Sequence, residues 1–532
     1  MSVSPIGNRN KGRRTEADDR LPPSSKLVIL RTSILWFSVP DEGLVPHLDD
    51  FNHSQLGKPF INMGLVRGAE IVYHMVFEIK PRIGLVTFGH RYFKMPYQEL
   101  RERLQSQLTE YPVDLRVFEK IPISVKETVE AANFFRSNDV DVVLIYVADW
   151  PSEEFPVVLA RELMEYPFVI LGSHRLESEK SFVPFAGITS MTGNFMRVGK
   201  HFFPVLGAPA EKRTIDRVFK LAMAAATSKA LRRSTVGMFG GINLSQLDTG
   251  YSEFHVRKLV PGILHFDNTE LLSRFDEIGD GEALTIARDI ARKVGTVEVD
   301  QKQLVIAARA YLAVKQMIEQ HDLDAVTIRE WGTEREINEQ IFTVELAASL
   351  LMDEGKVVIP ECDIATTITS LATCMLARGP MFFGELAFAD FERNLIALIH
   401  TGHPSLSIMK NPKDVKITPA VVEVQDFLGK KEGVSLEGEL RDGRITLTKI
   451  SGRPMEDKLK MVVTGAQIQE GRNPFPGQGF TYAWIRPDCD ARQLLDTLIR
   501  EGFGHHMVIG YGDIREELDA LGDILDIKRV II

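Results

Sequence analysis

Apolar and polar positions along the first third of the chain alternate in blocks that predict strands and helices in turn. Four β-branched apolar runs have the length of strands, at residues 26–38, 83–89, 141–148 and 168–172. Between them, residues 97–108 and 125–137 carry apolar side chains at helical spacing. Strands that alternate with helices indicate a parallel sheet with crossover helices. We therefore predict an α/β domain over residues 26–180.

The same alternation continues in a second block. Residues 214–231 have a helical pattern, and residues 234–241 and 324–330 have strand patterns separated by further long helical stretches. A short apolar strand at 356–359 closes the block. We predict a second α/β domain over residues 181–360.

After about residue 415 the pattern changes to short alternating runs. They occur at residues 433–440, 444–451, 458–467 and 479–487, and they are typical of antiparallel strands in a barrel or sandwich. The predicted fold is α/β: two consecutive Rossmann-like parallel-sheet domains followed by a β-rich, barrel-like C-terminal domain over residues 361–532. Residues 1–25 are polar and contain proline and serine, and we expect a disordered tail there.

Composition narrows the class of protein. A length of 532 residues suggests about three domains, and a net charge of -10 argues against nucleic-acid binding. No apolar run approaches the roughly 18–20 residues of a membrane span, and the N-terminus lacks the apolar segment of a signal peptide. Cysteines number three and form no CxxC pair, which favours a reducing, cytoplasmic location.

The candidate chemistry lies in residues 356–405. Glu361 follows the strand at 356–359, Glu385 follows a second apolar run, and a third strand ends at His400, with His403 shortly after. Open α/β sheets keep their ligands at strand ends, so these carboxylates and imidazoles suggest a divalent-metal site able to move protons. Asp363 is better placed to cap the helix that follows it than to bind metal, and Cys362 is expected to serve in packing.

A late pair, His505 and His506, follows a glycine and opens a predicted strand. Successive side chains of a strand point to opposite faces, so at most one of the two imidazoles is expected to reach a metal. The segment 237–244 matches neither GxGxxG nor a P-loop, so nucleotide binding has little support.

Several motifs together resemble those of the L-fucose isomerase and L-arabinose isomerase superfamily. They are Pro-Glu-Cys-Asp at 360–363, Gly-Pro-x-Phe-x-Gly-Glu at 379–385, His-Thr-Gly at 400–402, and Gly-His-His-x-x-x-x-Tyr-Gly-Asp at 504–513. The fucose isomerase-like C-terminal-domain branch is the more similar. The likeness is specific only in residues 324–405 and 500–513, and the N-terminal third matches merely as an α/β domain.

The resemblance implies a manganese-dependent aldose–ketose isomerase (or one using another divalent cation) that acts through a cis-enediol. It implies that Glu361 and Glu385 bind the metal and also act as acid and base, with His505 or His506 as the late ligand. His400 matches the ligand that completes the site in the arabinose isomerase branch. The family forms homo-oligomers, commonly trimers or hexamers. In relatives the second acid is often Asp. The longer side chain of Glu385 would therefore shift the position of the catalytic base.

The sugar itself is not identified by these motifs. Side chains that could contact it are Arg329, Trp331, Asn473 and Tyr511, together with Phe475. Two alternatives stay open: a non-catalytic carbohydrate-binding or regulatory protein of the same fold, and another enediolate-forming metal enzyme, such as an epimerase or lyase.

Overall fold

The computed structural model describes residues 25–30, 33–38, 77–92, 95–177, 183–243, 246–250, 252–329, 343–420, 433–453 and 458–532. The chain divides into two compact units, Met1–Lys58 and Pro59–Ile532. In the first unit, β1 (Ser25–Leu30) and β2 (Ser33–Ser38) pair as an antiparallel sheet of two strands. We expected residues 26–38 to form one strand of the first parallel sheet, and that expectation is wrong because they form this hairpin instead. Except for Ser25, the predicted tail lies outside the described residues.

The first parallel sheet of the second unit has five strands. They are β3 (Arg82–Val86), β4 (Asp114–Val117), β5 (Val142–Val147), β6 (Phe168–Gly172) and β7 (Phe203–Leu206), in the order β4-β3-β5-β6-β7. Its crossover helices are α1 (Tyr97–Leu108), α2 (Val125–Ser137), α3 (Glu154–Glu162) and α4 (Pro184–Arg197). Alternate residues of β5 enter two different apolar cores, so both faces of the sheet are covered.

The second parallel sheet has four strands. They are β8 (Thr235–Phe239), β9 (Gly262–Phe266), β11 (Ala325–Ile328) and β12 (Val357–Pro360), in the order β12-β11-β8-β9. Its helices are α6 (Glu253–Val256), α7 (Asn268–Glu277), α8 (Asp280–Lys293), α9 (Gln301–Gln320), α11 (Glu345–Asp353) and α12 (Ile364–Ala377). Helix α5 (Lys212–Arg233) connects the two sheets and packs against the first one. Counted in chain order, both sheets begin 2-1-3-4, which is the order of a doubly wound sheet that binds ligands beyond the carboxyl ends of its strands. The predicted parallel sheets are therefore present.

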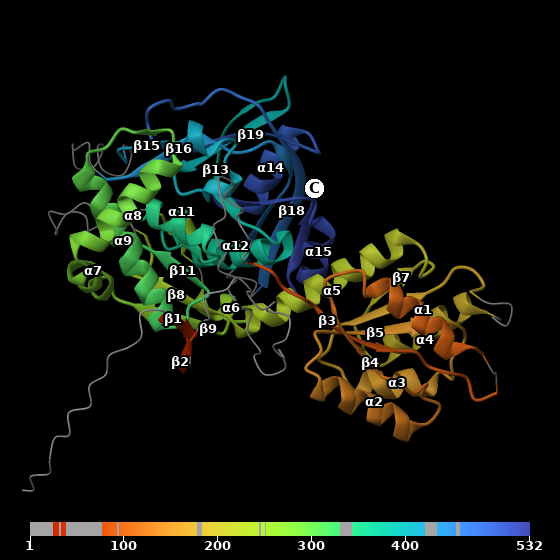
Figure 1. The fold of residues 1–532 in the computed structure, drawn as a ribbon. Helices are drawn as coiled ribbons and strands as arrows, with labels where there is room; N and C mark the ends of the chain where they lie inside the picture. The colour runs from red at the N-terminus through yellow and green to blue at the C-terminus, as the bar shows by residue number, and fades with distance from the viewer. Residues whose placement is uncertain are drawn as a thin grey trace, which may run out of the picture. The chain divides into compact units, whose positions relative to one another are not determined.

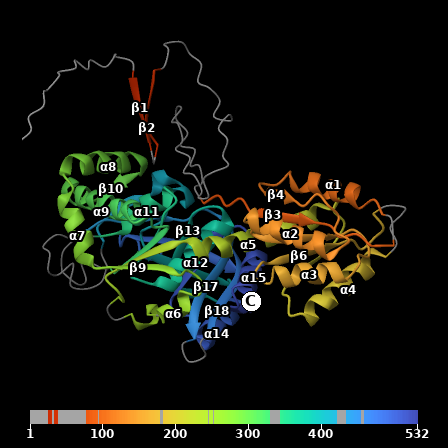
Figure 2. The same cartoon turned by 90° about the horizontal axis from the view of Figure 1, so that it is seen from below.

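A closed barrel of six antiparallel strands follows. Its strands are β13 (Met381–Asp390), β14 (Leu395–Thr401), β17 (Gly443–Arg453), β18 (Lys458–Gln469), β19 (Phe480–Pro487) and β20 (His506–Tyr511). The pairing of β18 with β19 closes the ring, which confirms the predicted barrel. The barrel strands appear in cyan to blue in Figures 1 and 2.

Short elements extend the barrel. Strands β10 (Thr296–Val297), β15 (Lys416–Thr418) and β16 (Ser435–Glu439) continue the sheet from β19, and β21 (Lys528–Ile531) pairs with β18. The remaining helices are α14 (Ala491–Glu501) and α15 (Arg515–Ile524), with 3-10 turns η2 (Leu247–Thr249), η3 (Leu406–Ile408) and η4 (Pro412–Asp414). No helix in the described part of the chain combines the length and the apolar character needed to cross a membrane.

Helix α12 joins the central sheet to the barrel. It leaves the carboxyl end of β12 and packs against β17 and β20, between the two sheets (Figure 1). The hydroxyl of Thr369 accepts a hydrogen bond from the Ile450 backbone N–H, at 3.0 Å. A side chain at Gly510 would bring its Cβ within 2.6 Å of Thr373, so glycine allows helix and strand to pack closely. The carboxyl edge of the central sheet is thereby held against the rim of the barrel.

Candidate active site

Glu361 lies in a strained turn between β12 and α12. Both Glu361 and Cys362 have left-handed backbone angles, with φ of 66° and 54°. Such angles cost non-glycine residues of order 1–3 kcal/mol each, so the surroundings must fix them. The Cys362 N–H donates to the Ile328 carbonyl at 3.2 Å, and its thiol lies 3.4 Å from the Phe239 carbonyl. Cys362, expected to serve in packing, thus ties the turn to β11 and β8, and Glu361 is only 3% exposed.

His506, the first residue of β20, bridges two carboxylates. Its Nε2 lies 3.0 Å from Oε2 of Glu361, and its Nδ1 lies 2.9 Å from Oδ2 of Asp363. The imidazole is completely buried. Burial lowers its pKa, but the two carboxylates outweigh that effect and raise the pKa to about 9. Metal-binding histidines commonly have their second nitrogen held by a carboxylate in this way.

His400 approaches Glu361 from the end of β14. Its Nε2 lies 3.7 Å from Oε1 of Glu361, while its Nδ1 lies 3.0 Å from the Thr401 hydroxyl. Burial depresses the pKa of His400 to about 4, so this imidazole is neutral near pH 7. The His-Thr-Gly motif needs glycine at its third position for a steric reason: a Cβ at Gly402 would lie 1.7 Å from the Leu436 carbonyl oxygen.

Three buried atoms at this point have no aligned hydrogen bond to any described residue. They are Oε2 of Glu361, Nε2 of His506 and Nε2 of His400. Glu361 is nevertheless ionised: burial raises its pKa, but His506, His400 and the side chain of Gln246 lower it to about 2. Buried polar groups are seldom left unpaired in folded proteins. A carboxylate and two imidazoles fit a divalent transition-metal ion, so the donor set suits such a cofactor.

Glu385 is brought to the same place by strand register. On β13 it pairs with His506 on one side and Ile399 on the other. Potential ligand atoms of Glu385, His400 and His506 lie within 4.8 Å of one another, and so do those of Glu361, His505 and His506. The five residues predicted as metal ligands therefore form two overlapping groups that share His506. We call these five residues the acid–histidine cluster.

The structure distinguishes the two neighbouring histidines. His506 is buried, whereas the His505 side chain is 34% exposed. Nδ1 of His505 lies 2.6 Å from Oδ2 of Asp248, and its backbone N–H donates to the same oxygen at 3.2 Å. The two side chains thus have different partners, as expected for successive residues at the start of a strand.

Asp363 caps α12 as predicted, and it also contacts the cluster. One carboxylate oxygen accepts from the Thr366 N–H at 2.9 Å, and the other accepts from the Thr366 hydroxyl at 2.7 Å and lies against His506. The buried Lys449 ammonium lies 3.7 Å from that second oxygen. Burial raises the pKa of Asp363, but Lys449, His506 and Thr366 together hold it far below its usual range.

Three nearby residues were not identified from the sequence. Asp248 holds His505, Gln246 donates to Glu361, and the Asn243 side-chain amide donates to Gln246 at 2.7 Å. All three follow β8, in or just after the glycine-containing segment that was judged only for nucleotide binding. Their place after β8 could have identified them as site residues. The sheet order reverses between β8 and β11, and ligands are expected at such a point.

His403 supports the cluster from one side. Its Nδ1 lies 2.6 Å from the Thr401 carbonyl, and its ring stacks on Phe382 with centroids 5.3 Å apart. Its centroid is 4.7 Å from that of His400. Burial holds the pKa of His403 well below its usual value, so it packs as a neutral ring.

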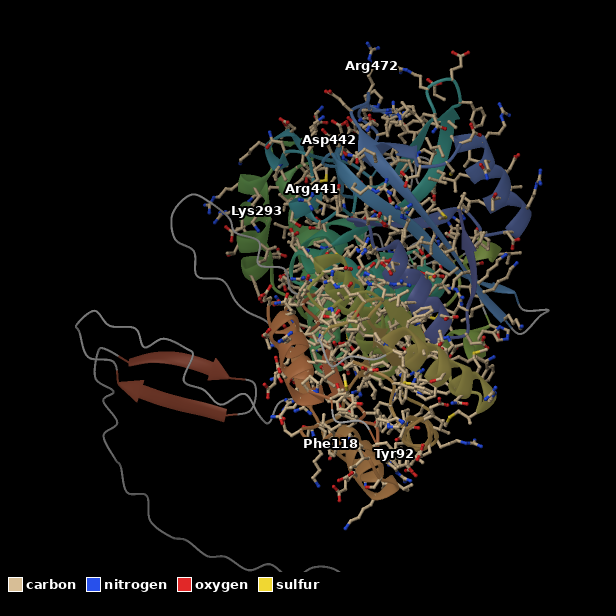
Figure 3. The ribbon with its side chains drawn as sticks, turned by 90° about the vertical axis from the view of Figure 1, so that its right-hand side faces the viewer. Tyr92, Phe118, Lys293, Arg441, Asp442 and Arg472 are labelled. Carbon is tan, nitrogen blue, oxygen red and sulfur yellow. The ribbon has the colours of Figure 1, made fainter. Side chains whose placement is uncertain are left out.

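The predicted sugar contacts are scattered. Arg329 directly follows β11, its N–H donates to the Phe239 carbonyl at 2.9 Å, and it therefore lies at the same sheet edge as Glu361. Trp331 lies outside the described residues. Tyr511 is five residues beyond His506 on β20, roughly 17 Å along the strand, and its hydroxyl donates to the Arg441 carbonyl at 2.9 Å. The Arg441 guanidinium lies 4.3 Å from the centroid of the tyrosine ring, and Arg441 is labelled in Figure 3.

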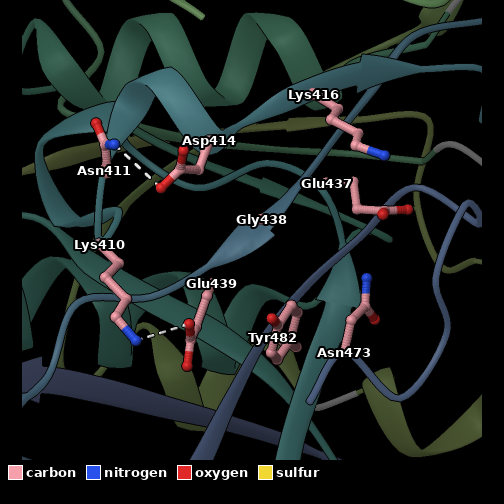
Figure 4. Close-up of a pocket in the computed structure, with 9 residues that line it drawn as sticks. All are labelled: Lys410, Asn411, Asp414, Lys416, Glu437, Gly438, Glu439, Asn473 and Tyr482. Atoms are coloured by element: carbon pink, nitrogen blue, oxygen red, sulfur yellow. Dashed lines mark hydrogen bonds and ion pairs between the residues drawn. The ribbon is translucent and has the colours of Figure 1, made fainter. Parts of the chain in front are cut away.

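Asn473 also lies away from the acid–histidine cluster. It lines a separate polar cavity with Tyr482, Glu437 and Glu439 (Figure 4). Phe475 packs against an aromatic group that contains Phe480 and Tyr482. The structure therefore brings together the predicted metal ligands and the edge that carries Arg329, but it does not bring Asn473, Phe475 or Tyr511 to them.

Comparison with known proteins identifies several sulfoquinovose isomerases as similar in sequence to this chain. No protein-family model matches the chain. It is 24% identical over 424 residues to the sulfoquinovose isomerases of Priestia aryabhattai and Priestia megaterium, covering 78% of this chain and 90% of each relative. The sulfoquinovose isomerase of Alkalicoccus urumqiensis is 22% identical over 353 residues, or 64% of this chain and 74% of the relative.

Among solved structures, a periplasmic solute-binding protein from Actinobacillus succinogenes with bound D-allose covers 56% of this chain and 93% of its own. Its identity is 13% and its TM-score 0.15, so this likeness bears on neither fold nor function. The sulfoquinovose isomerases are the informative relatives. They support a sugar isomerase family for this chain, without singling out the fucose isomerase branch.

Proposed function

We propose that this protein is a divalent-metal-dependent aldose–ketose isomerase. One observation carries the proposal: buried ligand atoms of Glu361, His506 and His400 converge without hydrogen-bond partners among the described residues, beside Glu385. A binding protein for a neutral sugar would not need the buried Glu361 carboxylate and two buried imidazoles next to a second, half-buried carboxylate, because burying charges without compensation is costly. The relatives named as sulfoquinovose isomerases support the same reaction class.

We assign Glu361, Glu385 and His506 as metal ligands, with His400 as a further one. A set that mixes carboxylate oxygen with imidazole nitrogen suits Mn²⁺ and other divalent transition metals. Bound there, such an ion would polarise the C1 carbonyl and C2 hydroxyl oxygens of an open-chain aldose and make the C2 proton more acidic. His505 belongs to the proposed site through its pairing with Asp248, which keeps its imidazole beside His506.

The two glutamates carry the proton transfers in this proposal. One carboxylate removes the proton from C2, giving an enediol, and returns that proton to C1. The other takes the proton from the C2 hydroxyl and delivers it to the C1 oxygen, so the aldose becomes a ketose with no net gain or loss of atoms. General acid–base catalysis of this kind contributes roughly 10²–10⁴-fold. The neighbours of Glu361 keep its carboxylate ionised, as a metal ligand requires.

The first substrate to test is a sulfonated hexose, because the relatives are named for sulfoquinovose. Arg329 offers a guanidinium at the sheet edge next to Glu361, and guanidinium groups pair well with anionic oxygens. We propose Arg329 as a contact for the charged end of such a sugar. The homo-oligomer expected from the family resemblance stays a prediction, which light scattering would check.

The experiment uses the full chain, stripped of metal and then supplied with Mn²⁺. Sulfoquinovose, L-fucose, L-arabinose and D-glucose are incubated with it in deuterated water, and products are followed by NMR. We expect ketose to form only with metal, and to form fastest from sulfoquinovose. An epimer instead of a ketose would favour the epimerase alternative, and sugar binding without any product would favour the binding protein.

Two variants sharpen this experiment. Glu385→Gln keeps the size of the side chain but removes its charge, and we expect turnover to fall by at least roughly 10²-fold. Asp390→Asn makes a similar change further along the same strand, next to an exposed turn, and should leave turnover within about twofold. Equal turnover by wild type and Glu385→Gln would contradict the assignment.

A further inference from the structure

The outer side of the barrel carries a second polar cavity, which the proposed reaction does not use. Its volume is about 170 Å³. It lies between the segment 410–416, strand β16, the loop at Asn473 and the Tyr482 ring of β19 (Figure 4). None of its lining residues belongs to the acid–histidine cluster. A volume of this size equals that of roughly five or six water molecules, so the cavity suits one small ligand.

Strand register separates the cavity from the acid–histidine cluster. Glu385 pairs with Ile399, and Ile399 pairs with Tyr482. The backbones of Glu385 and Tyr482 are therefore two strand spacings apart, roughly 10 Å in total. Ile399 is only 6% exposed and packs in an apolar group with Phe480 and Tyr482. A ligand in the cavity would therefore not reach the proposed metal site through this wall.

Two almost fully buried polar side chains face the cavity. Tyr482 is 9% exposed and lines the cavity. Glu437 is 6% exposed; one of its oxygens accepts from the Gly479 N–H at 3.1 Å, and no cation of the described chain lies within ion-pair distance of it. Both side chains line the cavity, where a ligand that donates and accepts hydrogen bonds can reach their oxygens.

The other lining groups favour a neutral ligand. Lys410 pairs with Glu439 at 3.0 Å, and Lys416 lies 3.5 Å from Glu298, so both ammonium groups are already neutralised. Asp414 and Glu437 add further negative charge, which disfavours an anionic ligand. The amide of Asn473 and the ammonium of Lys410 are donors, and the carboxylates are acceptors, as vicinal hydroxyl groups require.

We propose that this cavity is a second binding site, specific for a neutral polyhydroxylated molecule such as a monosaccharide or an alditol. Tyr482 contributes the face of its ring and its hydroxyl, Glu437 accepts hydrogen bonds from hydroxyl groups, and Asn473 donates to them. Asn473, first considered as a contact of the catalysed sugar, thereby belongs to this second site. The proposal does not depend on the isomerase assignment, because binding here needs neither metal nor turnover.

The test is calorimetric titration of the metal-free full chain with D-glucose, D-sorbitol and D-gluconate. Gluconate is matched in size but carries a negative charge. We expect the two neutral compounds to bind in the millimolar range, and gluconate to bind at least roughly tenfold more weakly. Glu361→Gln, which alters only the acid–histidine cluster, should bind the neutral compounds as the wild type does.

Pocket variants decide where the sugar sits. Glu437→Gln removes a charged hydrogen-bond acceptor, and we expect roughly tenfold weaker binding or more. Tyr482→Phe removes one neutral hydrogen bond, and we expect roughly two- to tenfold weaker binding. Asp442→Asn changes an exposed acid outside the lining and should leave the affinity unchanged. The proposal would be overturned if neither D-glucose nor D-sorbitol bound, or if gluconate bound more tightly than they do. It would also be overturned if both pocket variants bound the neutral compounds as tightly as the wild type does.

Discussion

Nε2 of His506 and Oε2 of Glu361 lie 3.0 Å apart, yet neither atom makes an aligned hydrogen bond with a described residue. The opposite nitrogen of His506 is held by Asp363 at 2.9 Å. A histidine fixed on one side and unpaired on the other, next to an unpaired carboxylate oxygen, has the arrangement expected of two ligands of one cation.

The first prediction concerns Asp363 as the residue that orients His506. Asp363→Asn should keep the helix cap, because Asn caps about as well as Asp, but it should weaken Mn²⁺ affinity by roughly 10–100-fold. Asp490→Asn is a matched control: Asp490 caps α14 by accepting from the Gln493 N–H at 3.0 Å, and it contacts no cluster residue. Calorimetric Mn²⁺ titration of both variants, at a temperature where each is folded, checks this. An unchanged affinity in Asp363→Asn would show that the carboxylate does not position the ligand.

The second prediction separates His505 from His506. His506→Ala removes a proposed ligand, and we expect Mn²⁺ affinity to fall by more than the roughly 10–100-fold typical of an outer-shell contact. His505→Ala removes a partner of Asp248 and should cost no more than that range. Binding titrations of the two variants give the comparison. A larger loss in His505→Ala would reverse the assignment.

The third prediction concerns Tyr511, whose place on β20 removes it from the cluster. Tyr511→Phe loses the hydrogen bond to the Arg441 carbonyl, and we expect the free energy of unfolding to fall by about 1 kcal/mol. The ratio kcat/KM should stay within about twofold of the wild type. Urea unfolding and steady-state kinetics provide both measurements. A large fall in kcat/KM with unchanged stability would instead favour contact between Tyr511 and the sugar.

The fourth prediction concerns Glu517 and the pH dependence of stability. Glu517 lies on α15, facing α5, and its nearest ion-pair partner is Lys220 at 4.0 Å. Burial raises its pKa from 4.5 to about 7, so the folded protein holds a proton there that the unfolded chain has lost. The contribution of Glu517 to the free energy of unfolding is therefore most favourable below pH 4.5. It falls by about 3 kcal/mol in all as the pH rises toward 7.

Glu517→Gln should abolish this pH-dependent loss, because glutamine cannot ionise. The free energy of unfolding in urea would be measured at pH 5 and pH 8 for wild type and variant. Glu516→Gln removes the neighbouring ion pairs with Arg217 and Lys220 and leaves the buried Glu517 in place, so the difference between the two pH values should persist. If Glu517→Gln shows the same difference as the wild type, the carboxyl is already ionised in the folded protein.

The sequence predicted the elements whose signals are local. Apolar runs of strand length indicated both parallel sheets, and alternating runs indicated the barrel. The capping role of Asp363 followed from its place before a helix, but its contact with His506 joins residues 143 positions apart and leaves no local signal. Asp248 and Gln246 were missed for the same reason, since a loop after β8 becomes part of the site only when the barrel meets the sheet edge.

Register explains the remaining differences. Tyr511 is near His506 in the sequence, but an extended strand separates them, whereas Glu385 is far away in sequence and pairs directly with His506. The run 26–38 has the composition of a sheet strand, but Ser25–Leu30 and Ser33–Ser38 form two strands that pair with each other. Composition alone does not distinguish these outcomes, because both strands would be apolar and β-branched.

The proposed metal site is tested by the number of Mn²⁺ ions bound per chain, measured by equilibrium dialysis and elemental analysis. Wild type, Glu361→Gln and Glu392→Gln would be compared, since Glu392 is an exposed glutamate between β13 and β14. We predict one tightly bound ion in wild type and in Glu392→Gln, and none in Glu361→Gln. Retention of that ion by Glu361→Gln, or its absence from the wild type, would contradict the proposed metal site.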